Sequence, residues 1–173
     1  SEGLLREFTM LIKRQLLMQN SNGNILNEGY IAGNLTGVQF LAGSSLSGGI
    51  TNAGSIVGAI GINVINGARI SGGIINTVGG YISSINNAGY IGANGSGSNS
   101  AIRIIGATIA GGITNSGTIE GGWGGAIHVK TAALAGGITN SVLLTSTFAT
   151  VTLDTNATVI GGIHNLAGGT IYG

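Results

Sequence analysis

The chain repeats one short motif at a nearly fixed interval. The pattern Gly-Gly-Ile-x-Asn occurs five times, and a looser copy over residues 24–27 precedes them. The asparagines that close these six copies are Asn27, Asn52, Asn76, Asn115, Asn140 and Asn165, and the numbering advances by 25, 24, 39, 25 and 25 along this series. A period of about 20 to 30 residues, with Gly, Ile and Asn at fixed positions, is typical of a repeat architecture. Such a fold has long regular surfaces, so we expect any functional site on these surfaces or at the two ends.

The composition excludes several classes of protein. Charged residues make up only 6 % of the 173 residues, whereas an ordinary soluble domain has about 25 %. The formal net charge of +1 gives no electrostatic basis for nucleic-acid binding. The absence of cysteine excludes disulfides and thiolate metal sites. Because no run of about 18 apolar residues occurs, the sequence predicts no transmembrane segment.

Residues 1–20 differ from the rest of the chain and predict one amphipathic α-helix. Apolar residues recur there at helical spacing and form a face that includes Leu5, Phe8 and Ile12. The charged residues of this segment lie on the opposite face. We expect the apolar face to cover one open end of the repeat stack or to contact another subunit. Binding to a membrane surface is a third interpretation, although the polar face mixes acidic and basic residues.

Residues 24–173 have the composition of short β-strands separated by tight corners. Residues 50–56 and 113–119 share one pattern, a strand, an Asn-x-Gly corner and a second strand. We expect three strands and three corners in each rung of about 25 residues, and five to six rungs in an all-β, parallel β-helix. Because Asn and Gly tolerate left-handed backbone angles, we expect Gly54 and Gly117 to adopt them at the corners.

The repeated asparagines predict a ladder. When identical side chains stack at one corner, their amides can bond to each other along the stack. We therefore expect one corner column that holds the asparagines Asn52, Asn76, Asn115, Asn140 and Asn165. The long interval between Asn76 and Asn115 departs from the period, and we interpret it as a rung of near-normal length plus a looped-out insertion. An additional unit around Asn87 leaves the phase of residues 76–115 open.

The sequence offers little for catalysis or for cofactor binding. Hydrolysis of polysaccharides needs paired carboxylates, but the repeat region has isolated charges such as Glu120 and Lys130. The two histidines, His128 and His164, occupy different phases of the rung, so the pattern predicts no metal site. We expect no catalytic residue, no cofactor and no metal.

Aromatic residues are the remaining candidates for contacts. Tyr30, Tyr81 and Tyr90 each follow a corner glycine, and this position is either an outward strand position or a stripe that contacts a ligand or a subunit. Trp123 stands among four glycines and is either a packing residue or a binding platform.

Residues 113–119, Ile-Thr-Asn-Ser-Gly-Thr-Ile, with their flanking Gly-Gly pairs, resemble the passenger repeats of bacterial autotransporters and haemagglutinin-like surface proteins. The resemblance covers roughly residues 24–173. It implies a right-handed β-helix and an extracellular or cell-surface location on a bacterium.

These observations give two expectations for function. The first is a non-enzymatic structural protein that polymerises head to tail into filaments, because a β-helix end exposes unpaired strand edges and the terminal rung near Ile163 and Ile171 carries no cap. The second is an adhesin or passenger fragment that binds host or surface glycans. A carbohydrate-active enzyme would require a cluster of acidic residues on one face.

Overall fold

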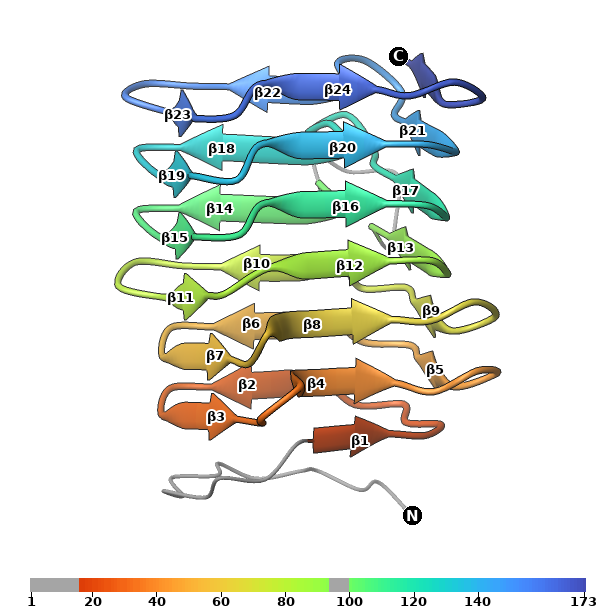
Figure 1. Ribbon diagram of the computed structural model, residues 1–173, viewed down its shortest axis with the longest axis vertical. Coiled ribbons are helices and arrows are strands. Elements are labelled where there is room, and N and C mark those ends of the chain that lie inside the picture. The colour runs from red at the N-terminus through yellow and green to blue at the C-terminus, as the bar shows by residue number, and fades with distance from the viewer. Residues whose placement is uncertain (1–15, 94–99) are drawn as a thin grey trace.

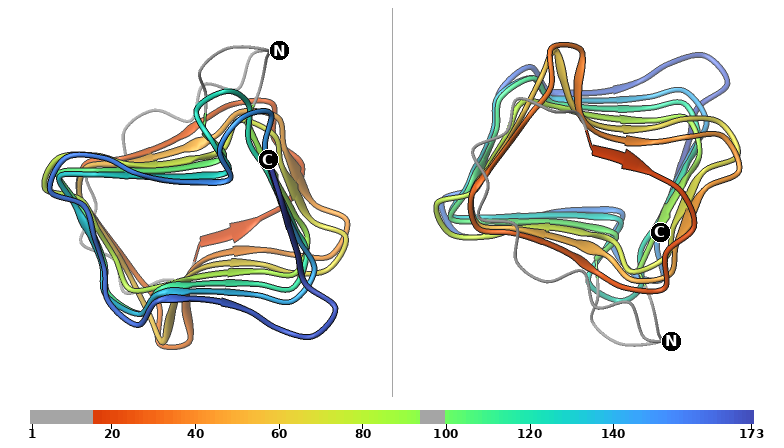
Figure 2. Two further views of the ribbon diagram at one scale, coloured as in Figure 1. Left: turned by 90° about the horizontal axis from the view of Figure 1, so that it is seen from above. Right: turned by 90° about the horizontal axis from the view of Figure 1, so that it is seen from below.

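The computed structural model describes residues 16–93 and 100–173 and shows a β-solenoid whose strands pair only in parallel (Figure 1). The described residues contain no helix. Each complete rung has four strands, and the chain runs through the back, left, front and right walls of Figure 1 before it rises to the next rung. Seen along the axis, the rungs superpose as a four-sided outline (Figure 2).

The four walls are parallel sheets, which we name from their places in Figure 1. The front wall contains β1 (Leu16–Met18), β4 (Thr36–Phe40), β8 (Ile60–Val64), β12 (Ile85–Asn87), β16 (Ile113–Asn115), β20 (Ile138–Asn140) and β24 (Ile163–Asn165). The back wall contains β2 (Ile25–Asn27), β6 (Ile50–Asn52), β10 (Ile74–Asn76), β14 (Ile102–Ile105), β18 (Ile127–Lys130) and β22 (Val151–Leu153).

The side walls are built from shorter strands. The left wall contains β3 (Tyr30–Ala32), β7 (Ser55–Val57), β11 (Tyr81–Ile82), β15 (Thr108–Ile109), β19 (Ala133–Leu134) and β23 (Thr158–Val159). The right wall contains β5 (Ser45–Leu46), β9 (Arg69–Ile70), β13 (Tyr90–Gly92), β17 (Thr118–Glu120), β21 (Leu143–Thr145) and β25 (Thr170–Tyr172).

The parallel pairing and its period confirm the expected solenoid, but the expectation of three strands per rung is wrong. Ile50 pairs with Ile25 one rung below and with Ile74 one rung above, so the rungs follow the period of the asparagines. Each complete rung consists of two half-rungs. Each half-rung has one strand of the back or front wall, followed by one strand of the left or right wall. The second half was missed because strands such as Ile60–Val64 end in no Asn-x-Gly corner.

A column of β-branched and leucine side chains fills the interior from every wall. Ile50, Ile74 and Ile102 stack in the back wall, and Ile56 and Ile82 stack in the left wall, all with almost no exposed surface. Burial of one such side chain contributes about 1.5–3 kcal/mol. Stacked aliphatic side chains of successive rungs therefore form one continuous hydrophobic core along the solenoid.

The long interval between Asn76 and Asn115 is one and a half rungs. Asn76 ends β10 in the back wall, and Asn87 ends the next wall strand, β12, in the front wall, half a rung on. Asn115 then pairs with Asn87 from one full rung above. The repeated motif thus changes from the back wall to the front wall. The interpretation as one rung of near-normal length plus an insertion is wrong, because the interval includes an extra half-rung.

The expected N-terminal helix does not extend over residues 16–18, which form β1. Leu16–Met18 pairs in parallel with Val38–Phe40 of β4, so the solenoid already includes this strand before residue 24. Leu5, Phe8 and Ile12, the residues expected on the apolar face of the helix, lie outside the described residues.

The corner glycines Gly54 and Gly117 are required because a β-carbon would not fit there, and not because of their φ angles. Gly54 and Gly117 do not have the expected left-handed angles, which occur instead in the longer corners at Gly79 and Gly168, with φ of 80° and 86°. A β-carbon at Gly54 would collide with the carbonyl oxygen of Gly29, and one at Gly117 with that of Gly89. Each of these corners therefore lies directly on the backbone of the rung below.

We expect Gly117→Val to lower the free energy of unfolding by at least about 1 kcal/mol, and by up to about 3 kcal/mol, because the backbone of two rungs must separate. For a chain of this size, this loss lowers the melting temperature by roughly 2–4 °C per kcal/mol. Thr114→Val, at an exposed position of the neighbouring strand, is the control and should change little. An unchanged melting temperature for Gly117→Val would contradict the close contact.

Candidate functional site

The asparagine ladders form the most regular polar structure of the chain. On the back wall, Nδ2 of Asn27 donates to Oδ1 of Asn52 (2.6 Å), and Nδ2 of Asn52 donates to Oδ1 of Asn76 (2.9 Å). The expectation of one column is wrong, because the motif changes walls after Asn76. Asn52 and Asn76 therefore belong to a different ladder from the later asparagines.

The second ladder lies on the front wall and begins at Asn87. The amide bonds run from Asn87 to Asn115 (2.8 Å), from Asn115 to Asn140 (2.7 Å) and from Asn140 to Asn165 (2.8 Å). Asn115 and Asn140 have no exposed surface, and each amide nitrogen also donates to corner carbonyls. The ladders thus pair buried polar groups that would each cost about 1–3 kcal/mol if left without partners.

The three tyrosines do not form one stripe. Tyr30 and Tyr81 lie two rungs apart on the left wall, with Ser55 between them. Tyr90 lies on the right wall, where it pairs with Arg69 below and Thr118 above. A corner glycine precedes strands of the left wall and strands of the right wall alike. Its position in the sequence therefore did not show to which of these two walls each tyrosine belongs.

Tyr90 belongs to a cluster that spans three rungs of the right wall. The guanidinium carbon of Arg69 lies 3.8 Å from the centre of the Tyr90 ring, an arrangement worth about 0.5–1 kcal/mol at an exposed site. The Tyr90 hydroxyl donates to Oε2 of Glu120 at 2.9 Å. Burial raises the pKa of this hydroxyl, and the Glu120 carboxylate raises it further. The cluster thus connects three neighbouring rungs through the Tyr90 side chain.

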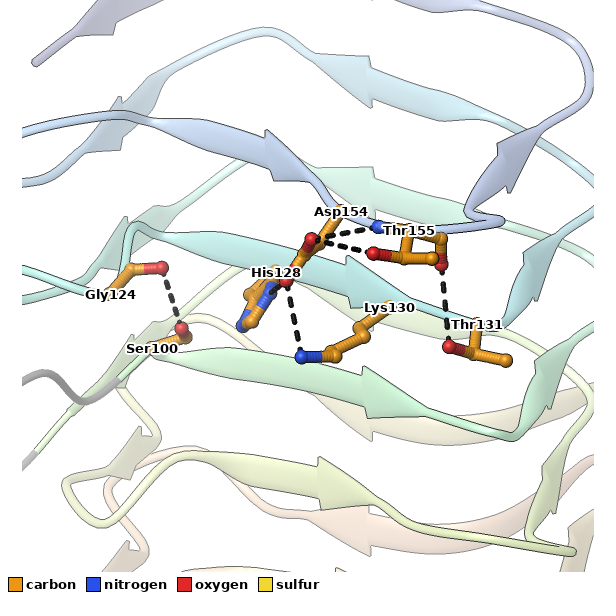
Figure 3. Close-up of polar contacts among 7 residues, drawn as sticks. All are labelled: Ser100, Gly124, His128, Lys130, Thr131, Asp154 and Thr155. Carbon is orange, nitrogen blue, oxygen red and sulfur yellow. Dashed lines mark hydrogen bonds and ion pairs between the residues drawn. The ribbon is translucent and has the colours of Figure 1, made fainter.

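A second ionisable cluster lies on the back wall near its upper end (Figure 3). Oδ2 of Asp154 lies 3.4 Å from Nζ of Lys130 and 3.8 Å from Nε2 of His128. The backbone N–H of Thr155 lowers the pKa of Asp154, and Lys130 lowers it further. Burial lowers the pKa of His128, with a further contribution from Arg103. The histidine and the carboxylate are too far apart for a hydrogen bond, so this arrangement lacks the oriented pair that activates a nucleophile.

Two further contacts in Figure 3 join one rung to the next. Ser100 Oγ donates to the carbonyl of Gly124 at 2.8 Å, and Thr131 Oγ1 donates to the carbonyl of Thr155 at 3.3 Å. Sequence reasoning placed His128 and His164 in different phases of the rung, and the structure places them on the back and front walls. In the described part of the chain, no three His, Asp or Glu side chains gather where they could hold a metal ion.

An exposed aromatic pair projects from two successive rungs. Trp123 lies in the loop between β17 and β18, and Phe148 lies in the equivalent loop of the next rung. Their ring centres are 6.3 Å apart, with an angle of 21° between the planes. The residues are 58 % and 70 % exposed. Trp123 therefore packs on one neighbour and still presents a large apolar surface to solvent.

Strands β22–β25 form the upper edge of the described solenoid. They pair with the rung below, and no described strand lies above them. Ile163 continues the buried column of Ile138, and Ile171 continues that of Leu144, yet they are 44 % and 39 % exposed. Both therefore occupy inward-facing positions without a covering rung.

Comparisons with known proteins give no match to any family model, to any curated protein or to any solved structure. Within residues 16–93 and 100–173, we find no helix with the length and hydrophobicity that spanning a bilayer requires.

We expect Asn115→Ala to destabilise the protein by about 1–3 kcal/mol, because it removes the donor to Oδ1 of the buried Asn140, and an unpaired buried group costs that much. Asn87 also loses one acceptor but keeps the carbonyls of Gly89 and Thr118. Asn165→Ala, at the exposed end of the same ladder, is the matched control and should cost less than about 1 kcal/mol. Denaturant unfolding of both variants measures the difference. Equal losses would show that the ladder does not stabilise the interior.

Proposed function

We propose that this chain is a non-enzymatic structural protein of a bacterial surface that associates end to end into filaments. The observation that carries the proposal is the upper edge of the described solenoid, formed by β22–β25. Its strands offer unpaired backbone groups, and its inward-facing side chains, among them Ile163 and Ile171, are partly exposed. Both features favour addition of a further rung.

The chemistry of such an edge favours a head-to-tail contact. The strands of the first and last described rungs run in the same directions and carry the same inward pattern, as successive rungs within the column do. A contact between two different surfaces repeats without closing, unless its rotation forms a ring, and so it produces filaments. The low content of charge, 6 % of the residues, offers little repulsion against this association.

The extracellular setting and the right-handed coil belong to the same proposal. They are supported by the resemblance of residues 113–119 to the passenger repeats of bacterial surface proteins. The handedness is also supported by the path of the chain, because front strands run to the right and back strands run to the left as the chain rises (Figure 1).

The sparse ionisable groups support a role without catalysis. The two clusters on the walls, around Tyr90 and around Asp154, each join a cation to a carboxylate or a ring across neighbouring rungs. Such pairs connect rungs. Neither offers two carboxylates at the separation of about 5–10 Å that glycoside hydrolysis uses.

A second candidate function is glycan binding by an adhesin, and the aromatic pair favours it. An exposed indole can stack on the apolar face of a sugar ring, and Phe148 holds Trp123 from one side. Trp123 is the only tryptophan, so its fluorescence reports on the pair alone. If this function is correct, an array of bacterial and host glycans will yield ligands that shift the emission. Trp123→Ala should then abolish their binding.

For the filament proposal, we expect the 173-residue chain to form longer assemblies as its concentration rises, seen by light scattering and electron microscopy. Ile163→Lys and Ile171→Lys should each reduce assembly at least about tenfold, because a lysine at an inward-facing position must lose its hydration when a rung covers it. Val78→Lys is the control. It replaces an apolar residue that is even more exposed but lies at a corner in the middle of the column.

The circular dichroism of each variant should match that of the wild type, since the substituted isoleucines lie on the last rung. A wild-type chain that remains monomeric at millimolar concentration would overturn the proposal. Glycan binding would then be the better-supported function.

A further inference from the structure

The back wall carries most of the positive charge in the described part of the chain. The described strands of the front and left walls contain no Lys, Arg, Asp or Glu, and those of the right wall contain only Arg69 and Glu120. Arg103 and Lys130 lie on successive strands of the back wall, β14 and β18, and Asp154 directly follows β22. Two of the three described Lys and Arg side chains therefore share one wall.

These cations lie on a side surface of the column. Arg103 and Lys130 occupy outward positions of their strands and are exposed. His128 lies between Arg103 in the rung below and Thr152 in the rung above. A further rung would stack on β22 and would not cover the outer face of β14 and β18. The patch therefore does not depend on how the column ends.

The guanidinium of Arg103 is not engaged by any described residue. Arg69 lies over the ring of Tyr90, and Lys130 contacts Asp154, but Arg103 has no ion pair, ring contact or hydrogen bond of its side chain in the described part of the chain. A guanidinium presents its N–H donors in a planar fork that matches a carboxylate. Arg103 therefore offers a binding group for an anion.

The carboxylate of Asp154 lies between two possible partners (Figure 3). Its Oδ1 accepts from the backbone N–H of Thr155 at 2.8 Å and from the Thr155 hydroxyl at 3.2 Å. Its Oδ2 lies 3.4 Å from Nζ of Lys130 and 3.8 Å from Nε2 of His128, and this Nε2 is enclosed without a hydrogen-bond partner. A shift of Oδ2 by about 1 Å would complete a hydrogen bond to His128.

The protonation of His128 decides between the two partners. Burial lowers the pKa of His128, Arg103 and Lys130 lower it further, and Asp154 raises it, while Thr152 in the rung above is uncharged. The imidazole is therefore neutral at neutral pH. When it is protonated at lower pH, its Nε2–H can donate to Oδ2 of Asp154, and Lys130 loses its counter-ion. The summed charge of these groups then rises from +1, for two cations and one carboxylate, to +2.

The loop that carries Trp123 leads directly into β18. Gly124, the next residue, lies on the same face as His128 and Lys130 in Figure 3. Trp123 and His128 are five residues apart in the sequence, so their Cα atoms are at most about 18 Å apart. A single oligosaccharide of several sugars can therefore contact the indole and the cations together.

We propose that the back wall binds an acidic glycan, with the negatively charged groups of its sugars on Arg103 and Lys130 and a neighbouring sugar ring against Trp123. The inference rests on the second candidate function, glycan binding at Trp123, and specifies the class of glycan. Charge complementarity favours this class, because a neutral glycan would leave both cations unused. Binding strengthens in mild acid, when His128 holds Asp154 and Lys130 is released to the ligand.

Binding of oligogalacturonate to the full-length chain tests the class of glycan, measured by tryptophan fluorescence and isothermal titration. We expect it to bind more tightly than a neutral maltooligosaccharide of equal length and to weaken as salt is raised. Arg103→Gln and Lys130→Gln should each weaken binding at least about fivefold, because each removes a charged hydrogen-bond donor. Arg69→Gln removes the same charge from the right wall and is the matched control, with a change of less than about twofold.

The pH dependence tests the part played by His128. The affinity of the wild type should rise as the pH falls below about 6.5, because the pKa of His128 lies below this ordinary value. His128→Gln should remove the rise. Circular dichroism of every variant should match that of the wild type. An affinity of the wild type that does not change with pH would overturn the role of His128.

The outcomes separate this inference from glycan binding itself. Equal affinity for the acidic and the neutral oligosaccharide would overturn the acidic class and leave glycan binding intact. Unchanged binding in Arg103→Gln and Lys130→Gln, with binding lost in Trp123→Ala, would do the same. Equal losses in Arg69→Gln and Arg103→Gln would show general attraction by charge and overturn the site. No response to any glycan, acidic or neutral, would overturn both proposals.

Discussion

Parallel backbone pairing between each rung and the next is the interaction on which the rest of this structure depends. It places equivalent residues of successive rungs side by side, so a repeated sequence becomes a set of straight columns. Isoleucine columns then form the core, and asparagine columns become hydrogen-bonded ladders. The same pairing explains the glycine corners, because at Gly54 and Gly117 the backbone of one rung rests on that of the rung below.

The repeated motif was sufficient to predict a parallel solenoid and its period, because identical residues at a fixed interval stack most simply on one another. It did not predict that each complete rung has four strands. It also did not predict that the motif moves from the back wall to the front wall after Asn76. Asn87 was hard to place because Ser83-Ser84 precedes its strand, where the five full copies of the motif have Gly-Gly. The half-rung strands such as Ile60–Val64 carry the same inward pattern with valine in place of asparagine. A search for asparagine alone therefore passed over them.

Candidate sites were harder to predict than the fold, since they depend on register. Arg69, Tyr90 and Glu120 are spaced along the chain at intervals that differ from each other and from the period of the asparagines. Only the pairing of β9, β13 and β17 brings them together on one wall. Trp123 and Phe148 meet for the same reason, because their loops occupy the same corner of successive rungs. Sequence spacing could suggest these residues but not their neighbours.

The common direction of the amide bonds has a consequence for the electrostatics of the column. All five side-chain bonds in the two ladders point from the N-terminal rungs toward the C-terminal ones. Aligned amide dipoles in a dry interior polarise one another, so each bond strengthens the next. Reversing one amide would oppose two neighbours at once. The ladders therefore give the solenoid an internal polarity, with its positive pole toward Asn165, and two copies that met through the same end would set like poles against each other.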